Sequence, residues 1–280
     1  MDDAPQFLPA AAFSLDTLAD LFTRGFAGYF YAATISAEML SNSVRADQID
    51  LARSVVMQVE GTLAGLAVVA LRGDQAWCGG FGITEPFRGR RLAVPLAEAM
   101  LAQARAAGAR RFSLEVLTRN APAIAVYRQV GFLHQRDVRI MRWVRDAHAA
   151  PAELAYAGTL VEAEPRALLA HFDAFHPVPA AWQRDLPALL VRGELRGLAL
   201  LEDERPAAYV LFQSADGAHA QIADMGATRT EGARVVLHAL LQGYTSVAST
   251  NEPENSALTA AFDTLGFAEI DRQHELAIDL

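Results

Sequence analysis

Residues 77–99 of the chain read WCGGFGITEPFRGRRLAVPLAEA, and the stretch runs from an apolar segment through a basic turn into a helix. The segment from Trp77 to Ile83 is apolar and broken by glycines, which is typical of a strand buried on both faces. Gly79 and Gly80 predict a bulge or the close approach of a ligand to the backbone. Since Pro95 has no N–H, the helix is expected to begin close to Arg91, with the proline in its first turn.

The basic turn Arg88-Gly89-Arg90-Arg91 has the composition of an anion site. The amides of a first helical turn have no intrahelical partner and lie at the positive end of the helix dipole. Guanidinium groups beside them can donate paired hydrogen bonds to phosphate oxygens. The turn therefore predicts phosphate or pyrophosphate binding. The structural alternative is an arginine-rich turn that only faces solvent.

A second motif, LEVLTRNAPAIAVYRQVGF, occupies residues 114–132. Asn120 is placed to cap a helix with Pro122 in its first turn, and Gly131 is placed to end that helix in a left-handed conformation. Tyr127 follows Asn120 by seven residues, so two helical turns bring both onto nearly the same face, where one ligand can meet both. The structural alternative is a capped helix with a buried tyrosine.

Composition and charge exclude several classes of protein and of binding site. The 280 residues are 52% hydrophobic and carry a net charge of −9, with arginine as the only strongly basic residue type. Residues 1–150 have 16 arginines and 14 acids, whereas residues 151–280 have 8 and 19. An acidic chain without a basic stripe argues against a nucleic-acid partner, and no apolar run is long enough for a membrane span. The single cysteine, Cys78, excludes an internal disulfide and cysteine-based metal sites. A cytoplasmic location without a bound metal is expected.

The remaining patterns of the first half place helices and strands around these motifs. Ser14 and Ser36 are expected to cap helices that run to about Gly28 and Arg45. Strands are expected at 54–60 and 62–71, joined tightly at Gly61, and at 110–117. The aromatic residues Phe26, Tyr29 and Tyr31 could contact a substrate, although helix-spaced aromatics are more often part of a core.

The second half repeats this order of elements. The segment 146–154 reads as a linker. Helical segments are expected near 165–175 and 180–190, a helix near 231–242, and strands at 195–201, 207–213, 218–225 and 245–250. The segment NSALTAAFDTLGF then places Asn255, Phe262, Gly266 and Phe267 at the spacing of Asn120, Tyr127, Gly131 and Phe132, offset by 135 residues. An internal repeat is the simplest account.

The two motifs together resemble the GNAT superfamily of N-acetyltransferases. Ile83, Arg88, Arg91 and Ala93 resemble its acyl-CoA loop, and residues 114–132 resemble its second signature. Arg91 departs from the pattern, because the family usually has glycine there. If that position needs a positive φ, Arg91 is strained; if the backbone is helical, the arginine adds a phosphate contact. The resemblance covers nearly the whole chain as a tandem GNAT protein, an arrangement similar to that of mycothiol synthase.

The resemblance implies transfer of an acetyl group from acetyl-CoA, the cosubstrate, to a primary amine. It implies that Tyr127 protonates the departing thiolate and that Glu115 accepts the ammonium proton, directly or through water. Glu115 is the weaker assignment, because many relatives carry their base on the motif strand, where this chain has Ala76, Cys78 and Gly80. The implied cofactor-binding residues are Phe81, Gly82, Ile83, Arg88, Gly89, Arg90, Arg91, Leu92, Ala93, Val94 and Asn120.

The expected fold class is α/β (α+β), with two GNAT-like domains at 1–148 and 152–280, each a mixed, mostly antiparallel sheet flanked by helices. The second copy has Phe262 in place of Tyr127, Thr250 in place of Glu115 and no arginine-glycine loop, so it is expected to be non-catalytic. The acceptor is expected to be a small-molecule amine or a peptide, and the sequence does not indicate an oligomeric state. A non-catalytic acyl-CoA sensor or interaction module is the alternative.

Overall fold

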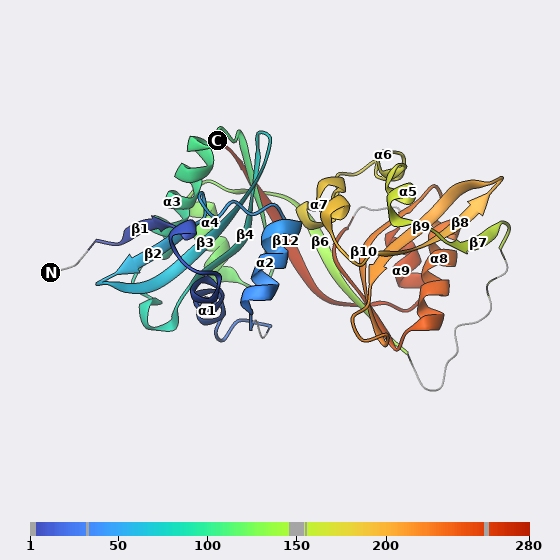
Figure 1. The fold of residues 1–280 in the computed structure, drawn as a ribbon, viewed down its shortest axis with the longest axis horizontal. Helices are drawn as coiled ribbons and strands as arrows, with labels where there is room; N and C mark the ends of the chain where they lie inside the picture. The colour runs from blue at the N-terminus through green and yellow to red at the C-terminus, as the bar shows by residue number, and fades with distance from the viewer. Residues whose placement is uncertain (1–3, 32–33, 146–153, 155, 255–257) are drawn as a thin grey trace. The chain divides into compact units, whose positions relative to one another are not determined.

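A computed structural model describes residues 4–31, 34–145, 154, 156–254 and 258–280. The chain divides into two compact units, residues 1–135 with 274–280 and residues 136–273. The C-terminal end of the chain therefore belongs to the first unit, as its red trace among the blue and green elements shows (Figure 1). Each unit has a mixed, mostly antiparallel sheet with helices on both faces, which confirms the expected fold class.

The first unit has the strand order β1-β2-β3-β4-β5, with the end of β12 beside β5. Neighbouring strands from β1 to β4 are antiparallel, and β4 and β5 are parallel. The strands are β1 (Gln6–Pro9), β2 (Val55–Val59), β3 (Thr62–Arg72), β4 (Gln75–Ile83), β5 (Arg111–Leu117) and β12 (Ala268–Asp279). The helices are α1 (Leu15–Gly25), α2 (Ala37–Ala46), α3 (Ala93–Ala106) and α4 (Ala121–Gln129), with 3-10 helices at Ala10–Ala12 and Glu85–Phe87.

Alternation along the strands gives this sheet two buried faces. Val55 and Met57 of β2 lie in the core beneath α3 and α4, whereas Val56 between them lies in the core beneath α1 and α2. Strand residues that alternate in this way bury both faces, so both sides need helical cover. The result is a three-layer unit in which β4 lies near the centre of the sheet.

The second unit has the strand order β7-β8-β9-β10-β11, with β6 beside β11. β10 and β11 are parallel, whereas the pairs β11–β6, β10–β9, β9–β8 and β8–β7 are antiparallel. The strands are β6 (Leu133–Val144), β7 (Thr159–Glu162), β8 (Arg196–Glu202), β9 (Arg205–Gln213), β10 (His219–Ala227) and β11 (Ser246–Pro253). The helices are α5 (Pro165–Leu169), α6 (Phe172–Phe175), α7 (Leu186–Val191), α8 (Thr230–Gly243) and α9 (Thr259–Thr264), with a 3-10 helix at Trp182–Arg184. α8 and α9 cover one face, and the shorter helices α5 to α7 cover the other.

The last strand of each copy lies with the opposite unit. Most of β6 belongs to the second unit and the end of β12 to the first, whereas domains at 1–148 and 152–280 keep each strand with its own copy. The expected domain boundary between residues 148 and 152 stays a prediction, because it concerns the two copies of the repeat and not the two compact units. Counted by structural unit, the net charges are −2 (12 arginines, 14 acids) and −7 (12 arginines, 19 acids), because the four arginines of residues 136–145 fall in the second unit. The charge asymmetry between the sequence halves is therefore reduced in the folded chain.

Most local predictions for the first unit are confirmed. Ser14 and Ser36 accept hydrogen bonds from Thr17 N and Met39 N at the starts of α1 and α2. Gly61, with φ +74°, joins β2 to β3 as expected. α1 ends at Gly25, so the expected end at Gly28 was wrong by three residues.

In the second unit, the two helical segments expected before β8 are confirmed, each divided into two short pieces. The region 165–175 is two short helices, and the region 180–190 is a 3-10 turn followed by a short helix. Proposed linker residues 146–153 and Asn255 of the repeat lie outside the described residues. Among the described residues, no helix is both long and apolar enough to cross a membrane.

Candidate active site

β4 and β5 separate partway along their length. Their parallel register joins Gln75–Trp77 to Arg111–Ser113, although β4 continues to Ile83 and β5 to Leu117. The register of β4 with β3 also shifts where Val68 faces Gly80 and Val69 faces Cys78, which leaves Gly79 as a bulged residue. This confirms the bulge predicted from the glycines. β4 therefore presents a backbone edge that β5 does not occupy beyond Trp77.

Helix α1 and its C-terminal end pack against one face of β4. A side chain at Gly80 would meet the ring of Phe22, and one at Gly82 would meet the backbone of Gly25. These glycines are therefore needed for helix packing on this face. The close approach predicted at Gly80 is made by the protein's own helix.

Glu115 lies on β5 at the point where the strands separate. Its Oε2 accepts a hydrogen bond of 2.8 Å from the indole nitrogen of Trp77, which lies on β4. The bond fixes the carboxylate between the two strands and leaves it half-buried.

Tyr127 projects from α4 against the same region of β4. Its ring makes edge contacts with Phe81 of β4 and with Phe132, both at 5.7 Å between ring centroids. The side chain is 6% exposed, and burial raises its pKa well above the usual value, with further increases from Cys78 and Tyr29. The phenol therefore keeps its proton at neutral pH.

Cys78 follows Trp77 on β4 and lies close enough to both groups to interact with each electrostatically. Burial raises the pKa of its thiol to about 12; a backbone hydrogen bond from Gly80 opposes this increase, and the charge of Glu115 adds to it. Cys78 is therefore an uncharged thiol beside Glu115 and Tyr127. A nucleophilic cysteine needs a lowered pKa, so the environment of Cys78 does not favour covalent catalysis.

The arginines of the basic turn have different structural roles. The Arg88 guanidinium donates to the carbonyl oxygens of Ile83 and Gly25, at 2.9 and 3.0 Å, and so fastens the turn to the end of α1. Arg90 lies over the ring of Phe87, with 5.0 Å between its Cζ and the ring centroid. The side chain of Arg91 makes no hydrogen bond, ion pair or ring contact with any residue that the structure describes. Of the three, Arg91 is the most available to a ligand.

The backbone of this turn is left-handed at two positions. Gly89 has φ +76° and Arg91 has φ +59°. For a non-glycine residue the left-handed conformation costs about 1 kcal/mol, so Arg91 occupies a strained position where the family usually has glycine. α3 begins at Ala93 with Leu92 as its N-cap, and no side chain caps it. The helix start predicted close to Arg91 is confirmed to within two residues, and Pro95 lies in the first turn.

The remaining predicted cofactor-binding residues lie at the starts of α3 and α4. Leu92 packs partly into the core, and Val94 lies in the first turn of α3. Asn120 caps α4, accepting a hydrogen bond of 3.3 Å from Ala123 N, and Gly131 ends the helix region with φ +103°, as predicted. The Asn120 side chain is thus engaged in a structural cap, and any role in cofactor binding stays a prediction.

An aromatic cluster beyond α1 was only partly anticipated. Phe22 stacks on Phe26 at 4.6 Å, Phe26 contacts Tyr29 at 5.3 Å, and Tyr29 contacts Phe30 at 5.2 Å. The preference for core positions was wrong for Tyr31, which is 41% exposed. Arg119, from the loop before α4, lies over the rings of Phe30 and Tyr31. Nothing in the local sequence pattern around Arg119 predicted this contact.

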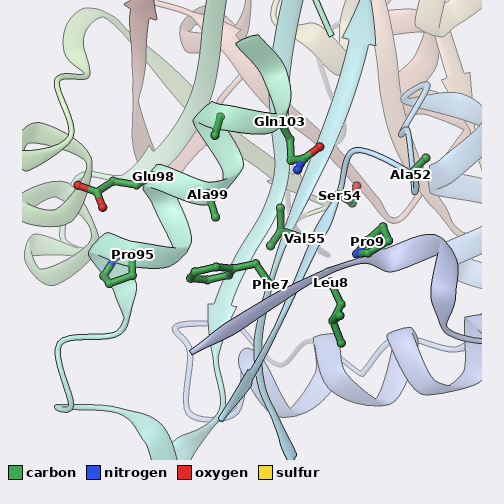
Figure 2. Close-up of a pocket in the computed structure, with 11 residues that line it drawn as sticks. Phe7, Leu8, Pro9, Ala52, Ser54, Val55, Pro95, Glu98, Ala99 and Gln103 are labelled. Carbon is green, nitrogen blue, oxygen red and sulfur yellow. The ribbon is translucent and has the colours of Figure 1, made fainter. Parts of the chain in front are cut away.

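A separate groove of about 660 Å³ lies between β1 and α3 in the same unit. Figure 2 shows Phe7 of β1 directed toward the helix that carries Pro95 and Ala99. None of the predicted site residues lines this groove. The groove is therefore distinct from the region of Glu115 and Tyr127.

Comparison with known families identifies the first unit. Residues 17–132 match the model of the Acetyltransferase (GNAT) family, and they include β4, the basic turn, Glu115 and Tyr127. The first unit is a GNAT acetyltransferase domain. Members of this family transfer an acyl group from acyl-CoA. No curated protein matches the chain.

Solved structures extend the likeness to the second unit. A GCN5-related N-acetyltransferase from Sphaerobacter thermophilus shares 17% identity, with a TM-score of 0.73 and coverage of 98% of this chain and 95% of that chain. A tandem GNAT protein from the clavulanic acid biosynthesis pathway shares 18% identity, with a TM-score of 0.72 and coverage of 99% and 98%. A putative acetyltransferase from Pyrococcus horikoshii shares 12% identity, with a TM-score of 0.69 and coverage of 100% and 90%. At these identities the likeness shows a common fold, which is consistent with a tandem GNAT protein.

Proposed function

We propose that the first unit transfers an acetyl group from acetyl-CoA to a primary amine of a small molecule or a peptide. The observation that carries the proposal is the separation of β4 from β5 at Trp77, with Glu115 and Tyr127 beside the opening. Acyl-CoA is expected as the donor because members of the GNAT family use it. The arrangement of these two side chains supports direct transfer between the two substrates.

The residues around the opening fit an acyl-CoA molecule. The part of β4 that is no longer paired with β5 includes Phe81, Gly82 and Ile83. Their backbone groups can therefore pair with an extended ligand as they would with an added strand. The exposed turn from Arg88 to Arg91 and the uncapped start of α3, Leu92 to Val94, suit the pyrophosphate. Arg88 serves there mainly by fixing the turn, because its guanidinium is bonded to two carbonyl oxygens.

Two side chains handle protons in this proposal. Acetyl-CoA supplies a thioester, whose acyl carbon is attacked by the amine as the bond to sulfur breaks. Tyr127 donates its phenolic proton to the departing sulfur, and its raised pKa keeps that proton available at neutral pH. Glu115 accepts a proton from the attacking amine, directly or through water, while Trp77 fixes the carboxylate. A backbone amide of β4 can polarise the carbonyl oxygen.

The alternative is a module that binds acyl-CoA without turnover. Tyr127 disfavours it, because binding alone needs the aromatic ring but not the hydroxyl. The second copy illustrates this point, since Phe262 packs against Phe267 at 4.9 Å with no hydroxyl.

The deciding experiment measures free thiol released from acetyl-CoA with a panel of primary amines, beside calorimetric binding of acetyl-CoA to the full chain. Amine-dependent thiol release above the uncatalysed rate supports the enzyme. Tight binding without release under any amine supports the sensor. Absence of both overturns acyl-CoA as the ligand. Mass spectrometry of the product distinguishes acetylation of an amine from hydrolysis.

A further inference from the structure

A row of aromatic side chains follows α1 and runs beside the proposed acetyl-transfer site. We call it the aromatic segment, and it consists of Phe26, Tyr29, Phe30 and Tyr31. The first three rings touch in succession, with centroids 5.3 and 5.2 Å apart. At the inner end Phe26 stacks on Phe22, whose ring lies where a side chain at Gly80 of β4 would be. At the outer end Phe30 and Tyr31 are 44% and 41% exposed. The row therefore leads from β4 to solvent.

The inner part of the aromatic segment lies close to Tyr127. Tyr29 is half-buried and adds to the raised pKa of the Tyr127 phenol, so the two groups are close enough to interact electrostatically. The start of the segment is fixed, because Arg88 of the basic turn donates to the carbonyl oxygen of Gly25 at 3.0 Å. The amide of Tyr29 donates to the carbonyl oxygen of Phe26 at 3.0 Å and holds the turn between them. The aromatic segment therefore borders the site in a fixed position.

Arg119 meets the aromatic segment from the other strand. It comes two residues after the end of β5 and four residues after Glu115. Its Cζ lies 4.5 Å from the ring centroid of Phe30 and 5.6 Å from that of Tyr31. The rings follow the helix that packs on β4, and the guanidinium follows β5. The outer part of the site therefore presents aromatic rings beside a fixed positive charge.

Exposed ring faces attract two kinds of ligand. They stack with other aromatic rings, and they attract cations such as those of a polyamine. Arg119 decides between the two, because its guanidinium already lies over Phe30 and Tyr31 and would repel a second cation there. A planar guanidinium also stacks on aromatic faces, so it adds to the surface that an aromatic ligand can contact.

We propose that the acceptor of the acetyl group is a primary amine on an aromatic body that carries no positive charge of its own. This inference rests on the acetyl transfer proposed for the first unit. The amino end reaches Glu115 and Tyr127, while the body stacks on the exposed rings and on the guanidinium of Arg119. From the neutral amine, the nitrogen gains the acetyl carbon and loses one proton. The sulfur of coenzyme A loses that carbon and gains one proton.

Steady-state kinetics of thiol release from acetyl-CoA by the full chain test this proposal with three primary amines of matched length. 2-Phenylethylamine has an aromatic body, and 2-cyclohexylethylamine has a saturated body of similar size. 4-(2-Aminoethyl)phenyltrimethylammonium has an aromatic body with a fixed positive charge. We expect kcat/KM for 2-phenylethylamine to exceed that for the cyclohexyl amine about threefold to tenfold. We expect the cationic body to lower kcat/KM about fivefold or more relative to 2-phenylethylamine.

Variants cancel the intrinsic reactivity of each amine, because every ratio is compared with that of the wild type. The double variant Phe30→Leu with Tyr31→Leu keeps apolar side chains without rings, and it should lower the phenyl-to-cyclohexyl ratio about threefold or more. Phe7→Leu is the matched control, since Phe7 is 39% exposed in the separate groove beside β1. Arg119→Gln should raise kcat/KM for the cationic amine about fivefold relative to 2-phenylethylamine. The KM for acetyl-CoA should stay unchanged in all of these variants.

Two results overturn the inference: the same phenyl-to-cyclohexyl ratio in the wild type and the double variant, or unchanged discrimination against the cationic body in Arg119→Gln. Arg119 is exposed, so its variant decides the matter even where the double variant does not fold. Thiol release with the saturated amine would in either case still support the proposed function. Absence of thiol release with these amines and with the wider panel contradicts the proposed function, and the inference falls with it.

Discussion

The indole nitrogen of Trp77 and the Oε2 atom of Glu115 lie 2.8 Å apart, joined by a hydrogen bond where β4 and β5 separate. Trp77 belongs to the last pair of the parallel register, and Glu115 is two residues beyond its partner Ser113. A side chain from the paired region thus fixes a carboxylate in the unpaired region. The bond gives Trp77 a positioning role in the proposed reaction.

The first prediction separates Glu115 from the residue that positions it. Glu115→Gln should lower kcat by roughly 10²- to 10⁴-fold if Glu115 is the base. Trp77→Phe should lower kcat about fivefold, the equivalent of roughly 1 kcal/mol for one hydrogen bond, with the KM for acetyl-CoA unchanged. Steady-state kinetics measure both. Glu98→Gln, on the exposed side of α3, is the matched control.

Combining the two changes adds a test of the proposed relationship. Because Trp77 acts through Glu115, Trp77→Phe should have little further effect in a Glu115→Gln background. Additive losses would assign Trp77 a role of its own. A wild-type kcat for Glu115→Gln would place the base elsewhere.

Tyr127 gives the second prediction. Tyr127→Phe keeps the ring that contacts Phe81 and Phe132 and removes only the hydroxyl. We expect kcat to fall roughly 10²- to 10⁴-fold, with affinity for acetyl-CoA and the melting temperature nearly unchanged. A loss of less than about threefold would show that the thiolate leaves without this acid.

The third prediction concerns Arg91, whose φ of +59° combines strain with an unengaged guanidinium. Arg91→Ala should weaken acetyl-CoA binding without unfolding the chain, because it removes a charge at the start of α3. Arg91→Gly should weaken binding similarly while relieving the left-handed strain, so it should be the more stable of the two variants. Calorimetry and thermal unfolding measure the two effects.

Arg105→Ala is the control for loss of one charge, because Arg105 is exposed in the last turn of the same helix. Its affinity for acetyl-CoA should match that of the wild type. An unchanged dissociation constant for acetyl-CoA in both Arg91 variants would contradict the phosphate-binding role. Arg91 would then be only a strained turn residue.

The parts of this fold that local chemistry decides were predictable from sequence. Ser14, Ser36 and Asn120 are capping residues in the structure because a short side-chain acceptor satisfies free amides in the first turn. Gly61 and Gly131 have the positive φ that their turns required. The repeat was also visible, because its spacing survives even where its residues have changed.

Relationships between distant segments were not predictable in the same way. Trp77 and Glu115 are 38 residues apart, and their contact depends on a register that neither strand's sequence specifies. The placement of β6 and β12 in opposite units was missed, because the two copies have similar last strands and local patterns fit either pairing. Arg88 resembled a phosphate ligand, but its partners at Ile83 and Gly25 are backbone carbonyls that carry no residue-specific signal.

Cys78 provides a fourth prediction that needs no substrate. With a pKa of about 12, its thiolate fraction at pH 8 is on the order of 10³-fold below that of a free cysteine, and the side chain is buried. The native chain should therefore react at least that much more slowly with a disulfide reagent than the chain unfolded in guanidinium. Since Cys78 is the only cysteine, the absorbance of the released thiol reports this site alone. Rapid reaction of the native chain would contradict the buried position.

The fifth prediction is a pH dependence of the second unit. Burial lowers the pKa of His176, but the hydrogen bond and charge of Asp224 and the Phe172 carbonyl outweigh that effect and the charge of Arg184, so the pKa is raised. A raised pKa means that the folded state holds this proton more tightly than the unfolded state does. The resulting stabilisation is fully present below the unfolded pKa of about 6.5 and is lost as pH rises through the folded value.

The midpoint of urea unfolding should therefore fall as pH rises from 6 through the raised pKa of His176, when measured by a signal from the second unit. His176→Gln should lower the midpoint at pH 6 and flatten its dependence on pH, because glutamine carries no proton to lose. His238→Gln, at a half-buried position of α8 that takes no part in the His176–Asp224 pair, should keep the wild-type profile. An identical pH profile in the wild type and His176→Gln would mean that His176, paired with Asp224, does not hold its proton more tightly in the folded chain than in the unfolded chain.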